Sequence, residues 1–465
     1  MSLSDYDFGD EFSSRGHWWL PQNPGDRISG TLTFSEGRIQ LELDGSFSVP
    51  ELEFPGLLSS PTMFKAAAIH GQTTEGDSCT VLRTAAFGVG QGSLRLRGNA
   101  LVVGAHWQDE ASSQIQKVVL RFAHLEEWAY QRLFQQGSGV SKDSFTFVCP
   151  TEPKTLLQID ELETVKSLVL TANLQVKMAR TKTSLITRSH VLVEFKHPTN
   201  LLAVNSVVRD IGNLLSLLVG EAVQPLKIRL SLSKDSNAPD AQVDYFLGLR
   251  NRTVINKSMF EMPFPLAALG EAETKNLFKN WFRNIESLRP VYSLLLSTVY
   301  EPDQYVQSTF LSLVQGLETF HRRLYEGIYI PKAEYEETRK SLVAAIPLQT
   351  TPRIREKLTG MLNWGNELSL RDRLKETLGS LSQGSWTKLT NHSVQEDFIH
   401  TVVDIRNNLT HYKETKKPTI IEKSLEMYNL NQQLRAVLTV LLLKHLGVEE
   451  NKAANALAAH LHLAH

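Results

Sequence analysis

The segment Arg406 to His411 reads Arg-Asn-Asn-Leu-Thr-His and carries side chains that could cleave RNA without a metal ion. A neutral imidazole can take the proton from a ribose 2′-hydroxyl, and a protonated imidazole can give one to the departing 5′-oxygen. A guanidinium can hold the phosphate, whose charge grows in the transition state. One copy of the segment supplies one histidine, so this chemistry needs a second imidazole.

The segment lies late in a predicted helix that begins at Ser393, where Ser393 and Glu396 have the spacing of a capping box. The expected buried face of this helix is formed by Phe398, Val402, Ile405 and Leu409. Arg406 and His411 stand roughly 140° apart on an ideal helix, at about 100° per residue. Either the helix distorts near its end, or two copies of the segment complete one site across an interface.

A short run of positive charge follows the segment at Lys413, Lys416 and Lys417, and we expect these lysines to contact RNA. The whole chain has 49 Lys and Arg against 50 Asp and Glu, for a formal net charge of -1. This balance excludes a protein coated in positive charge for nucleic acid. An RNA site must therefore be a small cleft with few phosphate contacts and a modest salt dependence.

Structural roles for the same residues stay open. Arg406 could cap carbonyls or pair with Asp404, and His411 could simply end the helix. His321 and Arg322, near the end of another predicted helix, are weaker candidates for RNA contact. A satisfied or solvent-exposed helical histidine is the competing interpretation of His321.

Basic residues also recur at every second position along another predicted helix, at Arg371, Arg373 and Lys375. This spacing spreads charge around the helix, so we expect a solvated face there.

The elements that would position these residues are helical from about residue 271 onward. Apolar residues from Val306 to Leu324 alternate at spacings of four and three, as on one stripe of a long helix. Further helices are expected over residues 332–345, 352–362, 368–378 and 419–446. We therefore predict a helical bundle over residues 301–465, joined by a helical connector over 261–300.

The first half of the chain has the sequence pattern of strands and turns. Residues 28–34 and 38–43 alternate apolar and polar side chains around a turn, the period of a half-buried hairpin. Similar short runs recur to about residue 248, interrupted by one helical pattern over 204–218. We predict a β-rich region of antiparallel sheets over residues 1–260, in one or two subdomains, and an α+β chain overall.

Several kinds of site are excluded or not expected. Cys79 and Cys149 are the only cysteines, which excludes a disulfide scaffold or an all-cysteine zinc site and fits a reducing compartment. There is no Gly-Lys-Ser/Thr phosphate loop and no His-Glu-x-x-His helix, so we expect no metal and no cofactor. The acidic start lacks a secretory pattern and no long apolar run occurs, so we expect a cytoplasmic protein without a membrane partner.

These residues resemble a known family. Arg406 to His411 matches the Arg, four-to-six residues, His signature of HEPN ribonucleases, with polar Asn407 directly after the arginine. The bundle, including Leu317 to Arg322, is similar to the HEPN domain of ApeA-type abortive-infection proteins. His17 to Pro24 (His-Trp-Trp-Leu-Pro-x-x-Pro) and Gly30 to Phe34 are similar to the start of the ApeA N-terminal domain. The resemblance to this family covers both ends of the chain, whereas the middle matches it only by its position between them.

The resemblance implies an anti-phage endoribonuclease that cuts RNA without a metal and leaves 2′,3′-cyclic phosphate and 5′-hydroxyl ends. Transfer RNA or other cellular RNA is the implied substrate, a phage-derived signal the trigger, and a homodimer through the HEPN domain the active form. Residues 1–260 would act as sensor. By position, Arg406 would bind and polarise the phosphate, His411 would be the acid/base, and Asn407 would orient one of them. The alternatives are a non-catalytic dimerisation module that binds RNA or protein, and a ligand-binding β-domain with a structural helical tail.

Overall fold

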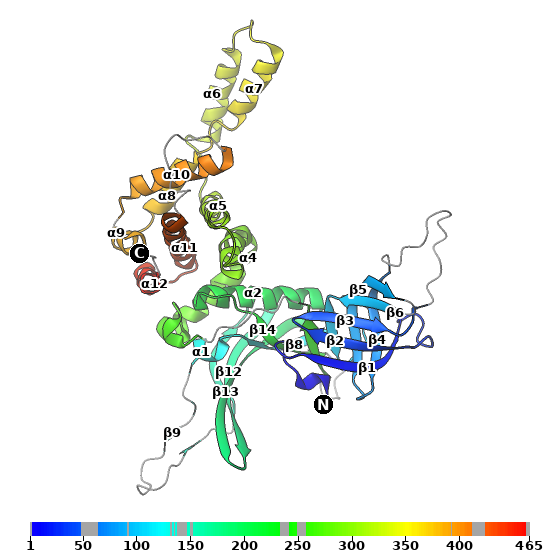
Figure 1. The fold of residues 1–465 in the computed structure, drawn as a ribbon. Helices are drawn as coiled ribbons and strands as arrows, with labels where there is room; N and C mark the ends of the chain where they lie inside the picture. The colour runs from blue at the N-terminus through cyan, green and yellow to red at the C-terminus, as the bar shows by residue number, and fades with distance from the viewer. Residues whose placement is uncertain are drawn as a thin grey trace, which may run out of the picture. The chain divides into compact units, whose positions relative to one another are not determined.

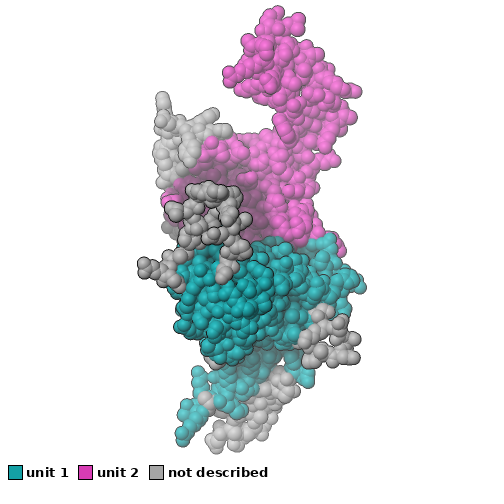
Figure 2. Space-filling model, turned by 90° about the vertical axis from the view of Figure 1, so that its right-hand side faces the viewer, with its two compact units in different colours: residues 1–282 teal, residues 283–465 magenta. Residues whose placement is uncertain are grey.

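The computed structural model describes residues 2–47, 64–90, 93–130, 133, 135–136, 147–148, 152–232, 241–248, 257–391, 393–411 and 424–461. The chain divides into two compact units, residues 1–282 and 283–465 (Figures 1 and 2), and each is described by itself. The division falls inside the stretch 261–300, which was expected to be a helical connector, and the three-part division itself stays a prediction.

Unit 1 is built on an antiparallel sheet of thirteen strands. Its strands are β1 (Phe12–Trp19), β2 (Ile28–Ser35), β3 (Arg38–Leu43), β4 (Lys65–Thr73), β5 (Ser78–Gly90), β6 (Ser93–Gly98), β7 (Ala100–Val103), β8 (Ile115–Phe122), β11 (Lys154–Asp160), β12 (Val165–Ala179), β13 (Lys182–Thr199), β14 (Pro225–Leu232) and β15 (Gln242–Leu247). The strand order is β11-β12-β13-β8-β14-β15-β7-β5-β4-β1-β2-β3-β6. A further pair, β9 (Gln135–Gln136) and β10 (Phe147–Val148), forms a small separate sheet.

Part of this sheet closes into a barrel, because β5 also pairs with β6 at the far end of the strand order. Alternation of buried and exposed side chains along β1 places Trp18 in the barrel core, where its indole N–H donates to the carbonyl of Gly30 at 3.2 Å. The Trp18 ring lies so close to Gly71 that a Cβ there would overlap it. The paired tryptophans at 18 and 19 are therefore core residues.

The predicted helical insertion is α2 (Leu201–Val219), which lies along the sheet in Figure 1. The Asn200 side chain caps its start by accepting from the Ala203 amide, and Gly220 ends it in a left-handed conformation. Within the described residues, α2 is the one helix long and apolar enough to cross a membrane, and 67% of that window is buried inside the structure. The apolar composition of α2 is accounted for by packing against the sheet.

The remaining helices of unit 1 are short α1 (Leu125–Trp128) and α3 (Leu266–Leu269), with 3₁₀ turns at Leu3–Asp5 and Met259–Glu261. Helix α4 (Glu271–Tyr300) contains Pro290, and the division between the two units falls inside it. The N-terminal β-rich region and the C-terminal helices together confirm the predicted α+β class.

Unit 2 is helical. Its helices are α5 (Val306–Leu324), α6 (Lys332–Ala344), α7 (Pro352–Asn363), α8 (Leu370–Gly379), α9 (Gln383–Thr390), α10 (Gln395–His411), α11 (Ser424–His445) and α12 (Glu450–Ala458). The apolar helix α11 packs against α5, α9 and α12, while α10 packs against α5 and α8. Helices α6 and α7 pack mainly against each other and extend from the bundle as a hairpin (Figure 1).

Three details of unit 2 differ from the sequence prediction. The short helices α9 and α12 were not predicted. Because α12 follows it, the helix expected over 419–446 is not the last one, and within the described residues it begins at Ser424. The predicted start at Ser393 also differs, because α10 begins at Gln395 and the Ser393 hydroxyl donates back to the carbonyl of Thr390.

Candidate active site

The motif segment occupies the last turns of α10, where fewer side chains are buried. The residues of α10 that are buried are Phe398, Ile399, Val402, Val403 and Ile405. Phe398 meets Trp386 of α9 edge to face, with ring centroids 5.1 Å apart. Leu409 is only half-buried, so the buried face ends about one turn earlier than predicted. The polar residues from 406 to 410 therefore lie at the edge of the bundle.

Arg406 is half-buried, and its Nη1 donates to Oδ1 of Asn407 at 3.3 Å. Asp404, its expected structural partner, pairs instead with His400 one turn earlier, with Nδ1 and Oδ2 3.0 Å apart. Within the described part of the chain no carboxylate pairs with Arg406. The guanidinium thus keeps donors that suit a phosphate.

Helix α10 stays regular through the motif. The Thr410 hydroxyl donates to the carbonyl of Arg406 at 2.9 Å and contacts that of Asn407 at 3.3 Å, bonds that follow the helical turn. Helix α10 continues to His411, so no break in the helix separates the arginine from the histidine. The His411 side chain and the expected RNA contacts Lys413, Lys416 and Lys417 lie outside the described residues.

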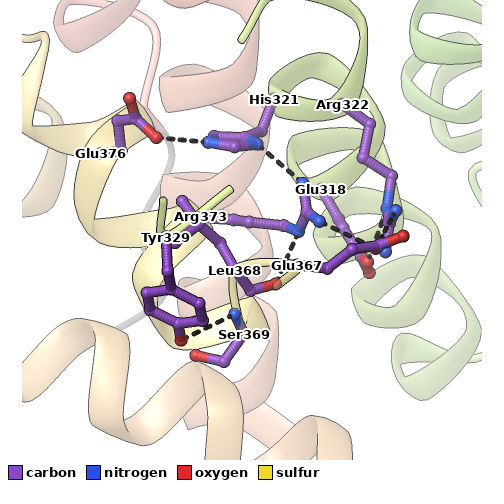
Figure 3. Close-up of polar contacts among 9 residues, drawn as sticks. All are labelled: Glu318, His321, Arg322, Tyr329, Glu367, Leu368, Ser369, Arg373 and Glu376. Atoms are coloured by element: carbon purple, nitrogen blue, oxygen red, sulfur yellow. Dashed lines mark hydrogen bonds and ion pairs between the residues drawn. The ribbon is translucent and has the colours of Figure 1, made fainter. Parts of the chain in front are cut away.

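A second polar cluster surrounds the fully buried His321 at the end of α5 (Figure 3). Its Nε2 lies 2.7 Å from Oε2 of Glu376, and its Nδ1 lies 3.1 Å from Nη1 of Arg373. Because a guanidinium can only donate, Nδ1 must accept, and we assign the proton to Nε2. The ring also stacks on Tyr325, with centroids 4.9 Å apart. His321 therefore offers no surface to RNA, which corrects the expectation that it contacts the substrate.

Arg373 connects this histidine to the acidic residue Glu367. Its side chain is 3% exposed, its Nε donates to the carbonyl of Leu368 at 2.9 Å, and its Nη2 lies 3.1 Å from Oε2 of Glu367. Glu367 also accepts from Nη1 of Arg322 at 2.9 Å. The expectation that Arg373 lies on a solvated face is wrong, because its side chain is buried. The loops before α6 and α8 meet beside it, where Ile328 and Glu367 form a β-bridge.

Arg322 differs from His321 in remaining near the surface. Its Nε donates to Glu318 one turn back at 3.1 Å, in addition to its bond with Glu367. Partial burial opposes the charge of Arg322, but the bonds to Glu367 and Glu318 outweigh it and raise the pKa of the guanidinium. Contact between Arg322 and RNA stays a prediction.

Two comparisons with family models decide the identity of the chain. The model described as ApeA N-terminal domain 1 matches residues 13–281, more than half of the chain. The model described as Apea-like HEPN matches residues 311–452, a range that contains the motif of α10 and the polar cluster around His321. The chain belongs to the ApeA family. It is therefore a member of a defence-associated family of HEPN nucleases. No curated protein and no solved structure matches it.

The HEPN domain of this ApeA protein also has a pocket of about 430 Å³ beside the buried cluster. Arg373 forms part of its wall, and Arg322, Lys332 and the exposed Trp364 line it with the loop residue Gly327. These groups come from α5, α8 and both ends of the α6–α7 hairpin. Glu326, Glu336 and Glu367 also line the pocket, so its wall carries both cationic and acidic groups.

The roles of Arg373 and Glu376 were not predicted, although one signal was present. His321 stands four residues after buried Leu317, and Arg373 stands four residues before buried Thr377. Residues four apart share a helix face, so both positions border buried stripes. Among the described residues, no group of three His, Cys, Asp or Glu side chains is arranged to hold a metal ion.

Proposed function

We propose that this ApeA protein is an anti-phage endoribonuclease that cleaves RNA by attack of the 2′-hydroxyl, without a metal ion. The products carry 2′,3′-cyclic phosphate and 5′-hydroxyl ends. The observation that carries the proposal is the state of Arg406: it stands at the bundle edge, hydrogen-bonded to Asn407 and paired with no carboxylate among the described residues. The substrate is cytoplasmic RNA, transfer RNA included, and a phage-derived signal acting on the β-rich unit is the trigger.

The roles follow from the acid–base requirements of the reaction. One His411 takes the 2′-hydroxyl proton, O2′ bonds to phosphorus, and the bond to the 5′-oxygen breaks as a second His411 protonates that oxygen. Arg406 holds the non-bridging oxygens, and Asn407 orients its guanidinium. Lys413, Lys416 and Lys417 bind neighbouring phosphates. The regularity of α10 supports a two-chain site, because positions 406 and 411 stand on different faces of an unbroken helix.

An uncovered apolar stripe on the α6–α7 hairpin supports the homodimer. No residue of α6 or α7 is buried, and Ile354, Leu358 and Met361 of α7 are 49%, 39% and 61% exposed. Their spacing of four and three places them on one helix face. Such a stripe on an extended hairpin suits burial against the same stripe of a second copy.

Charge along the hairpin favours an antiparallel arrangement of the two copies. Residues 340–357, toward its tip, carry Lys340, Arg353, Arg355 and Lys357 against Glu356, whereas residues 332–339, at its base, carry Glu334, Glu336 and Glu337 against Lys332 and Arg339. A two-fold axis across the hairpins would set each basic tip against the acidic base of its partner, which is a self-complementary contact.

The test is cleavage of total RNA by the purified full chain in EDTA, with the product ends analysed. We expect Arg406→Ala to lower the rate roughly 10²–10³-fold and His411→Ala roughly 10²–10⁴-fold. Exposed His400 on the same helix and Arg371 on α8 supply the controls His400→Ala and Arg371→Ala, which should cleave normally. Full cleavage by either motif variant would refute the proposal. RNA binding without products, unaltered by the motif, would instead favour the non-catalytic module.

A further inference from the structure

The strands β12 and β13 form a hairpin that extends well past the rest of the sheet in unit 1 (Figure 1). Strand β12 pairs with β11 as far as Ala172, and β13 pairs with β8 from Val191 onward. Between these points, from Asn173 paired with Arg188 to Ala179 paired with Lys182, the two strands pair only with each other among the described strands. We call residues 173–188 the ribbon.

The ribbon is strongly basic in a chain whose net charge is -1. No Asp or Glu occurs from residue 164 to residue 193. The ribbon contains Lys177, Arg180, Lys182 and Arg188, and none of these forms an ion pair with any residue that the structure describes. A surface that gathers charge of one sign creates a potential that attracts the opposite sign, so the ribbon suits a polyanion.

The strand register separates two faces of the ribbon. Lys177 lies opposite Ser184, and Lys182 and Arg188 fall on that same face by the alternation of the strand. The other face carries Val176 and Met178, which are 44% and 82% exposed. The ribbon therefore combines a row of cations with uncovered apolar side chains near its tip.

We propose that the ribbon binds duplex DNA, with its tip in the major groove and its cations on the flanking phosphates. The major groove of B-form DNA is about 12 Å wide and admits a two-stranded ribbon. Seven residues at about 3.4 Å each give the ribbon a reach of about 24 Å. Apolar side chains such as Met178 suit the methyl groups of thymine in that groove.

Duplex RNA fits the ribbon less well, because its A-form major groove is too deep and narrow for side chains to read. The ribbon thus assigns unit 1 a nucleic acid different from the substrate proposed for the HEPN domain. This inference goes beyond the proposed ribonuclease function and does not depend on it.

The test measures binding of the full chain to a labelled 24-base-pair DNA duplex by fluorescence anisotropy in EDTA. Parallel probes are the same duplex in RNA, the two single strands, and vesicles containing phosphatidylserine. Every protein carries Arg406→Ala so that RNA probes stay intact. The ribbon variant is Lys177→Glu with Lys182→Glu, and the control is Lys65→Glu with Lys279→Glu, which makes the same charge change at two other exposed positions of unit 1.

We expect tight binding to the DNA duplex, weakened at least tenfold by the ribbon variant and less than twofold by the control. Removing two phosphate contacts should also reduce the slope of log Kd against log salt by about 2. The proposal is overturned if the DNA duplex does not bind, if the RNA duplex, single strands or vesicles bind equally well, or if both variants weaken binding alike. RNA cleavage by the ribbon variant with Arg406 intact is measured separately, so failure of one proposal does not mask the other.

Discussion

At the scale of single residues, Gly327 allows a loop to cross the buried polar cluster of the HEPN domain. Its φ of +64° lies in the left-handed region, and a Cβ there would overlap Nη1 of Arg373 and lie 3.1 Å from Cε1 of His321. We expect Gly327→Ala to lower the free energy of unfolding by about 2 kcal/mol, from backbone strain and displacement of the guanidinium. A urea titration of the full chain, followed through the transition of the helical unit, measures this loss.

Gly360 provides the matched control for this substitution. It lies in the interior of α7, and nothing is within 4 Å of a Cβ built there. Because alanine is a better helix former than glycine, Gly360→Ala should stabilise by about 0.5–1 kcal/mol. Equal changes in the free energy of unfolding for Gly327→Ala and Gly360→Ala would show that the close approach at Gly327 does not affect stability.

Residue identity and spacing indicate which side chains can act, but not always which ones meet. The apolar spacing around Arg406 predicted the helix that carries the motif, but it also placed Leu409 on the buried face, and Leu409 is only half-buried. The pair of Asp404 with His400 could have been predicted, because residues four apart share a helix face whereas Asp404 and Arg406, two apart, do not. The partners of His321 lie more than 50 residues away in sequence, so they follow only from tertiary structure.

At the scale of elements, the long helices were predictable and the short ones were not. Helix α5 repeats its apolar spacing over five steps, whereas α9 and α12 span 8 and 9 residues and show few repeats. Short helices depend on docking against neighbours, as α12 does through Glu450. This residue accepts hydrogen bonds from Nζ of Lys444 at 2.6 Å and from the Ser382 amide at 2.8 Å.

The docking of α12 should make stability depend on pH through Glu450. Desolvation alone would raise its pKa, but the bonds from Lys444 and Ser382 outweigh it and lower the pKa to about 2. A carboxyl with a depressed pKa stabilises the fold above its unfolded value of 4.5, and this contribution is lost as the pH falls toward 2. We expect Glu450→Gln to cost about 2 kcal/mol at pH 7 and progressively less below pH 4.5.

Urea unfolding of wild type and variant between pH 7 and pH 3 measures this difference. Glu356→Gln, at an exposed position on α7, is the control and should leave stability unchanged at every pH. A gap between wild type and Glu450→Gln that stays constant with pH would contradict the assigned role of the carboxylate.

The hairpin of α6 and α7 gives the second prediction at this scale. If two copies bury the stripe of Ile354, Leu358 and Met361, then Met361→Lys places a charge in the interface. We expect the dimer dissociation constant to rise at least tenfold, measured by analytical ultracentrifugation. Tyr305, which is 83% exposed just before α5 and lies outside the hairpin, offers the control Tyr305→Lys, which should dimerise normally. An unchanged dissociation constant for Met361→Lys would place the dimer contact elsewhere.

At the scale of the whole molecule, the sequence predicted the order of its two kinds of structure but not the closure of the barrel. Local alternation identifies a strand such as β2 and its hairpin partner β3. Strand β6 closes the barrel because it pairs with β5 on one side and with β3 on the other. That second pairing spans more than 50 residues, beyond the reach of any local period.

The last prediction concerns the dimer, because the proposed site needs a histidine from each chain. A heterodimer of one wild-type chain and one His411→Ala chain, purified through two different tags, has one imidazole in the shared site. Without its partner acid or base, this heterodimer should cleave RNA roughly 10²-fold more slowly than wild type. A heterodimer that carries His400→Ala in one chain should cleave at the wild-type rate, because His400 pairs with Asp404 away from the motif. Retention of about half the activity by the His411→Ala heterodimer would mean that each chain holds a complete site, and the reaction would then need a second acid/base group from the same chain.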